Sequence, residues 1–489
     1  MLSDIKVKDL QVHYTPCTAR TPLKFGAVVV EQLDFCKVKA TVENQRGNVA
    51  EGWGGIFIMD FWGWPDSALS HSDKEAAMKD VVRGFCDLML AQTEPDHPIA
   101  LFENVEGDLR ALNIDVCARR NLTPPQPFLS ALVCASAVDA AVHDAFGIVN
   151  GIDIYEGYGA GFMPHDLSRW LGPSFRGKYP GDYVRDRYLP KVPVFHLCGG
   201  LDKLSRDELD DSDPADGYPN CLADWIAREG MYCLKVKLRG NDLDWDIDRM
   251  MRVYEIGREE LGKLGMTTMH LTADTNEQCA SPDYIIEMLH AIRAKSQDCY
   301  DRILYIEQPT GRDLKALGHD MRPLSALKPV IVDESLTDLE SFELALEQGW
   351  SGIALKSCKC QSSDALFWSR ASELGIPFSV QDLTNPSLSL MHSVGLGARL
   401  RTIMGVEANS RQFFPESTQP AEKAVHGGIF NLVGGRRTPP ASRGPALDTR
   451  WSAWWRRAGR RDGPGLGMRV PRRPARMAPG LVGTGGIRG

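Results

Sequence analysis

Two lysines separated by one residue, Lys235 and Lys237, lie within the apolar run "YCLKVKLRG". Three later runs of similar character end in an acidic residue and a fourth ends in a lysine, in the order Asp274, Glu307, Asp333 and Lys356. The successive intervals from Lys237 are 37, 33, 26 and 23 residues. Each interval has about the length of one strand followed by one helix. We therefore expect these side chains at the ends of successive strands.

Three carboxylates on neighbouring strands repel one another unless a cation lies among them. Oxygen ligands favour a hard ion such as Mg²⁺, with Mn²⁺ as the alternative, and leave positions open for water or substrate. We interpret Asp274, Glu307 and Asp333 as such a ligand set. A divalent ion on a substrate carboxylate stabilises the enolate that forms when the adjacent carbon loses its proton. A lysine beside the ion has a lowered pKa and can act as the base.

These side chains need a scaffold that brings strand ends together. From Lys191 the chain alternates between strand-like and helical patterns, with eight strands from "KVPVFHLCGG" to "RTIMGVEAN" and seven helices between them. Such alternation predicts a parallel sheet, and eight units predict a closed barrel. Reactive groups in such barrels stand at the carboxyl ends of the strands. The two flanking lysines and the three acids would then meet at one mouth.

The N-terminal part is different in character. Strand-like runs such as "KFGAVVVEQLDFCKVKATVEN" precede a helical stretch around "SDKEAAMKDVVRGFCDLML". Between them, "EGWGGIFIMDFWGWPD" is predicted to be a loop with exposed aromatics, with internal packing of Trp53, Trp62 and Trp64 as the alternative. The small-residue segment "FLSALVCASAVDAAVHDAFG" predicts a helix that ends at Gly147.

The pieces "KVK", "DTN", "EQP", "DES" and "LKSCK", in this order, resemble the enolase superfamily and, within it, the muconate lactonizing enzyme subgroup. The resemblance implies an α/β fold, a (β/α)7β-type TIM barrel with an N-terminal α+β capping domain. It divides the chain into a capping domain (1–145), a barrel carrying the active site (146–410) and a return segment packing on the capping domain (411–434). Residues 435–489 form an Arg/Pro/Gly-rich tail that is predicted to be disordered.

The same resemblance implies roles for individual residues. Asp274, Glu307 and Asp333 would bind Mg²⁺, and Lys237 and Lys356 would be the two acid–base catalysts. Residues expected to contact the substrate or support the ligands are Lys235, Asn276, Glu334, Asp382 and Glu407. The family often has a Gly-Gly turn after the sixth-strand lysine, where this chain reads "CKCQSSD". Lys359 in that stretch is expected on the surface, at the start of the next helix.

Lysines on both flanks of a metal suit a racemase or epimerase, because one removes a proton and the other returns one to the opposite face. The same groups also serve cycloisomerisation and the elimination of water, so a cycloisomerase or an acid dehydratase, which is a lyase, remains an alternative. We expect a Mg²⁺-dependent isomerase that abstracts a proton α to the carboxylate of a small-molecule substrate.

The composition, 43% hydrophobic and 25% charged, is that of an ordinary globular protein. We expect no apolar run near the roughly 18 residues of a membrane span. The start, "MLSDIKVKDLQVHY", lacks the layout of a secretory signal. The twelve cysteines are scattered without a Cys-x-x-Cys pair, which favours reduced thiols. These features predict a cytoplasmic protein without a membrane partner, and we expect a homo-oligomer.

The net charge of −8 is unevenly distributed. From Arg436 onward, 13 arginines and two aspartates give +11, so the rest of the chain carries −19. An acidic body repels nucleic acid, and only the tail could attract it. The alternative from another class is therefore a catalytically silent barrel with a nucleic-acid-binding tail. A shifted reading frame in GC-rich coding sequence would also produce such a tail composition.

Overall fold

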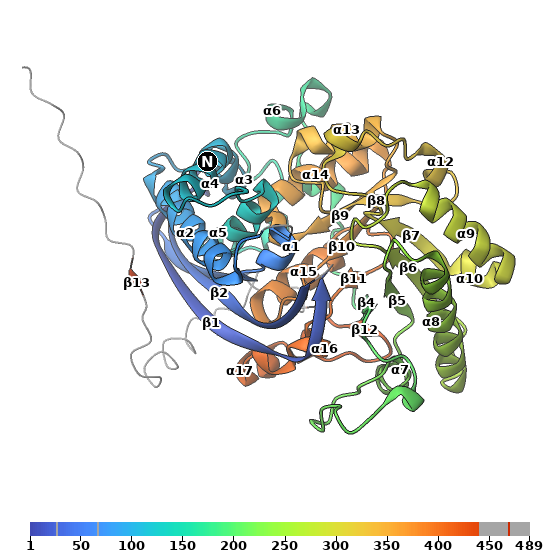
Figure 1. Ribbon diagram of the computed structural model, residues 1–489. Helices are drawn as coiled ribbons and strands as arrows, with labels where there is room; N and C mark the ends of the chain where they lie inside the picture. The colour runs from blue at the N-terminus through green and yellow to red at the C-terminus, as the bar shows by residue number, and fades with distance from the viewer. Residues whose placement is uncertain (26–27, 66–67, 440–467, 470–489) are drawn as a thin grey trace, which may run out of the picture.

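The computed structural model describes residues 1–25, 28–65, 68–439 and 468–469. Two layers of different construction lie side by side: an N-terminal antiparallel sheet with its helices, and a barrel of parallel strands (Figure 1). Apart from Gly435–Pro439 and Met468–Arg469, the predicted tail lies outside the described residues.

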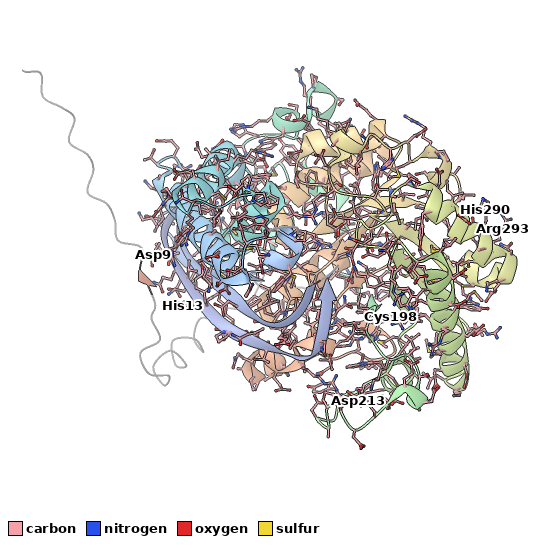
Figure 2. All side chains as sticks on the ribbon, viewed as in Figure 1. Asp9, His13, Cys198, Asp213, His290 and Arg293 are labelled. Atoms are coloured by element: carbon pink, nitrogen blue, oxygen red, sulfur yellow. The ribbon has the colours of Figure 1, made fainter. Side chains whose placement is uncertain are left out.

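The N-terminal sheet is built on a long, curved hairpin. Its strand order is β13-β1-β2-β3 and the pairings are antiparallel, with bounds β1 (Ile5–Phe25), β2 (Val28–Asn44), β3 (Val49–Phe57) and β13 (Met468–Arg469). The larger helices of this part are α2 (His71–Ala91), α4 (Glu106–Arg119) and α5 (Phe128–Asn150), with the short α1 (Asp60–Gly63) and α3 (Pro98–Glu103) between strands and helices. Figure 2 shows Asp9 and His13 on β1, on the opposite side of the molecule from His290 and Arg293.

The central helix α5 packs closely against β3. A Cβ atom at Gly54 would lie 2.0 Å from the carbonyl oxygen of Ala137, so only glycine permits this approach. The helix continues past the predicted end at Gly147 to Asn150, and Gly151, with φ 69°, terminates it. By length and composition α5 could cross a membrane, contrary to the expectation that no apolar run is that long. Its apolar window is 94% buried inside the fold, as in a core helix.

The prediction of an exposed tryptophan loop is wrong. The glycine-rich stretch is strand β3, because its glycines allow it to lie flat against α5, and the following residues form α1. The exposed fractions of Trp53, Trp62 and Trp64 are 6%, 4% and 2%. Large aromatic side chains bury much apolar area, which favours their inclusion in the core.

The predicted barrel is confirmed. Eight parallel strands close on themselves in the described part of the chain, since β11 pairs with both β10 and β4. The strands are β4 (Val192–Cys198), β5 (Cys233–Lys237), β6 (His270–Asp274), β7 (Ile303–Glu307), β8 (Val330–Val332), β9 (Gly352–Lys356), β10 (Phe378–Gln381) and β11 (Val406–Glu407).

Helices cover the outside of the barrel. They are α7 (Leu222–Glu229), α8 (Leu243–Lys263), α9 (Asp283–Lys295), α10 (Gln297–Arg302), α11 (Leu314–Leu317), α12 (Arg322–Ser325), α13 (Leu339–Glu347), α14 (Gln361–Leu374) and α15 (Ser387–Arg399). Two of the connections, β6 to β7 and β7 to β8, hold two helices each where the sequence pattern predicts one.

The segment after β11 returns to the N-terminal sheet. It contains α16 (Ser410–Phe413), α17 (Pro420–Val425), α18 (Gly427–Phe430) and β12 (Arg436–Arg437). The ring centroids of Phe414 and Phe57 are 4.8 Å apart, and Lys37 Nζ lies 3.4 Å from Glu422 Oε1. β12 pairs antiparallel with β4. The fold therefore extends past residue 435, where the sequence predicts that the tail begins.

The strand register sets the height of the candidate site. In the register of three neighbouring strands, Lys237 lies opposite Asp274, and Asp274 lies opposite Glu307. On the other side, Gln381 pairs with Lys356 and with Glu407. Side chains two residues apart on a strand face the same way. Lys235 therefore lies one layer deeper than Lys237, and a small apolar cluster of Tyr305, Ile331 and Ala354 comes from the neighbouring strands β7, β8 and β9.

Candidate active site

Lys235 is the centre of one half of the site. Its side chain is buried, and Nζ lies 2.7 Å from Glu307 Oε1, 2.7 Å from Glu407 Oε2 and 3.0 Å from Asp274 Oδ2. Glu307 Oε2 accepts a further hydrogen bond from Gln381 Nε2 at 2.7 Å. A buried ammonium group requires such compensation, so Lys235 is fixed in place by three strands besides its own.

Lys237 lies at the rim of this half. Its ammonium group pairs with Asp274 Oδ2, and its side chain is 11% exposed, so it is more accessible than Lys235. The backbone N–H of Asn276 donates to Asp274 Oδ1 at 2.8 Å. Asn276 thus supports the predicted ligand through its backbone, from a turn in which its φ is 46°.

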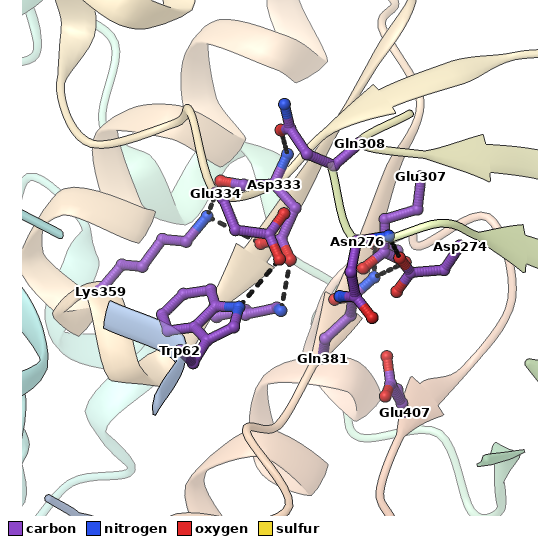
Figure 3. Close-up of polar contacts among 12 residues, drawn as sticks. Trp62, Asp274, Asn276, Glu307, Gln308, Asp333, Glu334, Lys359, Gln381 and Glu407 are labelled. Carbon is purple, nitrogen blue, oxygen red and sulfur yellow. Dashed lines mark hydrogen bonds and ion pairs between the residues drawn. The ribbon is translucent and has the colours of Figure 1, made fainter. Parts of the chain in front are cut away.

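Asp333 is the centre of the other half (Figure 3). Lys356 Nζ lies 2.5 Å from Asp333 Oδ2, and Lys359 Nζ lies 3.0 Å from Oδ1. Lys359 also donates to the Asp333 carbonyl oxygen and is fully buried, so its predicted surface position is wrong. A 3-10 turn, η5 (Ser357–Lys359), directs it inward, and Cys360, which follows the turn, has a positive φ of 76°.

The N-terminal domain reaches into this half of the site. Trp62 Nε1 donates to Glu334 Oε1 at 2.9 Å, and the Trp62 ring centroid lies 4.7 Å from Lys356 Nζ. Its carbonyl oxygen accepts from Arg312 Nη1 at 3.3 Å. A cation over an indole face is stabilised electrostatically. The sequence left open whether Trp62 is exposed or packs internally, and it did not identify this contact.

The lysines and acids stabilise each other's charged forms. Burial opposes ionisation of Asp274 and Asp333, but the adjacent lysines hold the pKa of each carboxyl below its ordinary value. Burial also disfavours a charged Lys356, yet Asp333 and Glu307 raise its pKa above the ordinary value. Lys235 is affected in the same way by Glu307 and Glu407.

Burial and neighbouring acids nevertheless disfavour ionisation of two carboxyl groups in the site. Burial raises the pKa of Glu307 well above its ordinary value, and Asp274 and Asp333 act in the same direction while Lys235 opposes them. Burial and the charge of Asp333 raise the pKa of Glu334 to about 7. Among the described residues, the buried oxygens Glu334 Oε2 and Gln381 Oε1 have no hydrogen-bond partner. Unsatisfied acceptors and mutually repelling carboxylates fit a divalent cation.

In the arrangement described, the carboxylates contact ammonium groups. Over the described ranges, no three His, Cys, Asp or Glu side chains are gathered closely enough to hold a metal ion. Metal binding at Asp274, Glu307 and Asp333 would therefore require these carboxylates to turn toward one another and the Lys237 and Lys356 ammonium groups to move aside. Lysine side chains have four flexible carbons and can make such a change without backbone movement.

Asp382 is less closely tied to the site. Its backbone N–H donates to the Glu407 carbonyl at 3.0 Å, and its Oδ1 accepts from the Thr384 N–H at 2.8 Å. Burial and the charge of Glu407 raise its pKa to about 8. Glu407 itself pairs with Lys235 and accepts from Asn409 Nδ2 at 2.7 Å. Both residues are buried, and Glu407 is engaged within the protein, whereas Asp382 Oδ2 has no hydrogen-bond partner among the described residues.

A capped barrel with lysines and carboxylates at its strand ends is the architecture of the enolase class of enzymes. A family model described as enolase C-terminal domain-like matches residues 220–472, more than half of the chain. The chain belongs to the enolase superfamily, as the sequence resemblance predicts. A comparison with curated protein sequences finds no match.

Solved structures share the whole architecture at low identity. The chain is similar to the L-Ala-D/L-Glu epimerase from Bacillus subtilis, with 16% identity, a TM-score of 0.58 and coverage of 90% of this chain and 98% of the epimerase. For the muconate lactonizing enzyme from Pseudomonas fluorescens the identity is 16%, the TM-score 0.55 and the coverage 92% and 98%. For a dipeptide epimerase from Cytophaga hutchinsonii, complexed with Mg and dipeptide D-Ala-L-Val, the identity is 16% and the TM-score 0.52. The match covers 84% of this chain and 88% of the epimerase.

Proposed function

We propose that this protein is a Mg²⁺-dependent racemase or epimerase that removes a proton α to the carboxylate of its substrate. The observation that carries the proposal is the placement of Lys237 and Lys356. They end β5 and β9, and three strands separate β5 from β9 in either direction around the closed barrel. Their amino groups therefore approach a molecule in the mouth from opposite sides.

The chemistry of the acids supports a metal ion between the lysines. Asp274, Glu307 and Asp333 would hold Mg²⁺, or Mn²⁺ in its place. When bound, the ion supplies positive charge to the substrate carboxylate, where the enolate charge develops. The Mg-containing dipeptide epimerase from Cytophaga hutchinsonii, which shares the fold, is in accord with this choice of ion.

Lys237 and Lys356 carry out the two proton transfers. In one direction Lys237 Nζ takes the α-proton and Lys356 Nζ donates a proton to the opposite face; in the other direction the roles reverse. Lys235 is bonded to three carboxylates and keeps its proton, so it acts by its charge rather than as a base. Trp62 covers one side of Lys356, whose side chain is buried in the arrangement described.

Deuterium exchange tests the proposal. Carboxylic acids (dipeptides, N-acylamino acids, sugar acids and muconates) are incubated with the protein and Mg²⁺ in D₂O, and α-deuterium is measured by mass spectrometry and NMR. We expect a substrate whose two stereoisomers both exchange. Lys237→Ala should abolish exchange from one stereoisomer and Lys356→Ala from the other, because each lysine serves one face.

The control variant is Lys295→Ala, since Lys295 is exposed and lies 3.9 Å from Asp248 on the outer surface. It should exchange like the wild type. Full exchange of both stereoisomers in either active-site variant would refute the assignment. A lactone or a dehydrated product, instead of an inverted centre, would place the protein among the cycloisomerases or acid dehydratases of the superfamily.

A further inference from the structure

A cavity lies where the segment after β11 meets the barrel, and it shares no residue with the candidate active site. Its volume is about 200 Å³, and it is bounded by residues of α7, α15, α16, α17 and α18, by β12, and by the segments between them. We call it the basic pocket, because four of its lining residues are cations: Arg228, Arg411, Lys423 and Arg437. The one acidic residue in the lining is Glu229.

Arg437 is the most unusual of these residues. Its side chain is fully buried, and Nη1 donates to the Ile429 carbonyl. Its Nε and Nη2 have no hydrogen-bond partner within the described residues. Burial and the charge of Arg411 lower the pKa of Arg437 to about 9, against the opposite influence of Asp382 and Glu229. A guanidinium group still carries its proton at neutral pH. An unpaired buried cation is costly, so a counterion would be strongly favoured.

The remaining charges of the pocket do not provide that counterion. Glu229 Oε2 already accepts from Arg411 Nε at 2.8 Å. Lys423 Nζ donates to the Pro415 carbonyl at 2.9 Å, and Arg228 Nη1 to the Gly217 carbonyl at 2.9 Å. Carbonyl oxygens satisfy a donor but leave its charge in place. In the described part of the chain, Arg228, Lys423 and Arg437 thus form no ion pair with an acid, and Asp382 and Glu229 act on Arg437 only from beyond ion-pair distance.

We propose that the basic pocket binds a compact oxyanion of the phosphate or sulfate class. The unpaired Nε and Nη2 of Arg437 offer two parallel donors, which is the geometry that guanidinium groups use for phosphate. Lys423 and Arg228 add positive charge nearer the surface, where the anion enters. Pockets for larger organic ligands measure about 300–1,000 Å³, so a cavity of this size suits an anion of a few heavy atoms.

Thermal unfolding with inorganic phosphate tests the proposal. The full chain is unfolded in increasing phosphate at constant ionic strength, with NaCl as the balancing salt and sulfate in a parallel series. At ten times the dissociation constant, phosphate should raise the unfolding midpoint by about 2 °C relative to NaCl. Arg437→Gln should abolish this shift.

Arg436→Gln is the matched control. Arg436 is the neighbouring residue on β12, is exposed, and donates to the Tyr232 hydroxyl at 3.0 Å. The Arg436→Gln variant should show the same phosphate-induced rise in the unfolding midpoint as the wild type. If Arg437→Gln does not fold, Lys423→Gln at the rim should weaken phosphate binding about tenfold in calorimetry. Phosphate and sulfate that stabilise the wild type no more than NaCl, or unchanged affinity in the pocket variants, would overturn the proposal. Neither readout needs a substrate, so failure here leaves the proposed enzymatic function untouched.

Discussion

The carboxylate of Asp333 is held between two lysines of one short segment: Lys356 Nζ lies 2.5 Å from Oδ2 and Lys359 Nζ lies 3.0 Å from Oδ1. Lys356 ends strand β9 and Lys359 ends the turn that follows. If Lys356 moves toward a substrate, Lys359 still orients the carboxylate. Lys359 is therefore a positioning residue in the proposed site.

Replacing Lys359 should destabilise the fold. Lys359→Met keeps much of the side-chain volume but leaves Asp333 Oδ1 buried without its cation. Removing one member of a buried ion pair costs about 3–5 kcal/mol. We expect a loss of this size in the free energy of unfolding, measured by urea denaturation. Lys295→Met, in an exposed pair with Asp248, should change it by less than about 1 kcal/mol. Equal values for the two variants would contradict the positioning role.

The contact between Trp62 and Glu334 can be tested by removing one hydrogen-bond donor. Trp62→Phe keeps a ring beside Lys356 but leaves the buried Glu334 Oε1 without the indole N–H. An unsatisfied buried group costs about 1–3 kcal/mol. Trp64→Phe is the control, because the indole nitrogen of Trp64 is buried and has no hydrogen-bond partner among the described residues. Trp62→Phe should lose more unfolding free energy than Trp64→Phe, and a smaller loss would argue against the hydrogen bond.

Asp364, in the first turn of α14, should make stability depend on pH. Burial raises its pKa to about 8, although Lys359 opposes the shift. The folded chain keeps this proton up to about pH 8, whereas the unfolded chain releases it near pH 4. The protonated Asp364 carboxyl therefore contributes fully to the free energy of unfolding below about pH 4, and this contribution is lost as the pH rises toward 8.

Asp364→Asn removes this titration while keeping the side-chain shape. Its advantage in unfolding free energy over the wild type should grow from pH 5 to pH 8, by about 1 kcal/mol per pH unit. Urea denaturation at each pH measures the difference. Asp248→Asn, at an exposed position on α8, should show no such trend. A constant difference for Asp364→Asn would mean that the buried carboxyl is ionised in the folded protein.

Glu307 should contribute to divalent-ion affinity. Glu307→Gln preserves the size of the side chain but removes a negative charge from the proposed ligand set. We expect at least a tenfold loss of Mn²⁺ affinity, which corresponds to about 1.4 kcal/mol. Electron paramagnetic resonance of free Mn²⁺ measures it without a substrate. Glu343→Gln, half exposed and paired with Arg370, is the control. Unchanged affinity in Glu307→Gln would exclude Glu307 as a ligand.

The barrel and the order of the charged strand ends could be predicted because they repeat at regular intervals. Eight strands alternate with seven helical connections, and the register of β5, β6 and β7 then brings Lys237, Asp274 and Glu307 to one height. These positions depend on local pattern and on the closure of the sheet. Neither requires knowledge of which distant side chains meet.

Lys359 and Trp62 were missed for two different physical reasons. Lys359 follows the strand by three residues, and a helix start there would expose it, but the intervening 3-10 turn reverses its direction. Trp62 lies 272 residues before its partner Glu334, so the contact depends on how the two domains dock. A tryptophan in a glycine-rich run carries no local signal for such docking. Its burial is visible only in the assembled fold.

Strand β12 has a consequence for truncation. β11 has two residues and covers Val194 and Phe195 of β4, while β12 covers Val192 and Pro193 beside them. Deleting the chain from residue 435 would thus remove β12 and expose the edge of β4 at Val192 and Pro193. The backbone donors and acceptors of that edge would then be free to pair with another molecule. A shortened protein that ends after Pro439 would keep β12 on this edge of β4. The two shortened proteins should therefore differ in their tendency to aggregate.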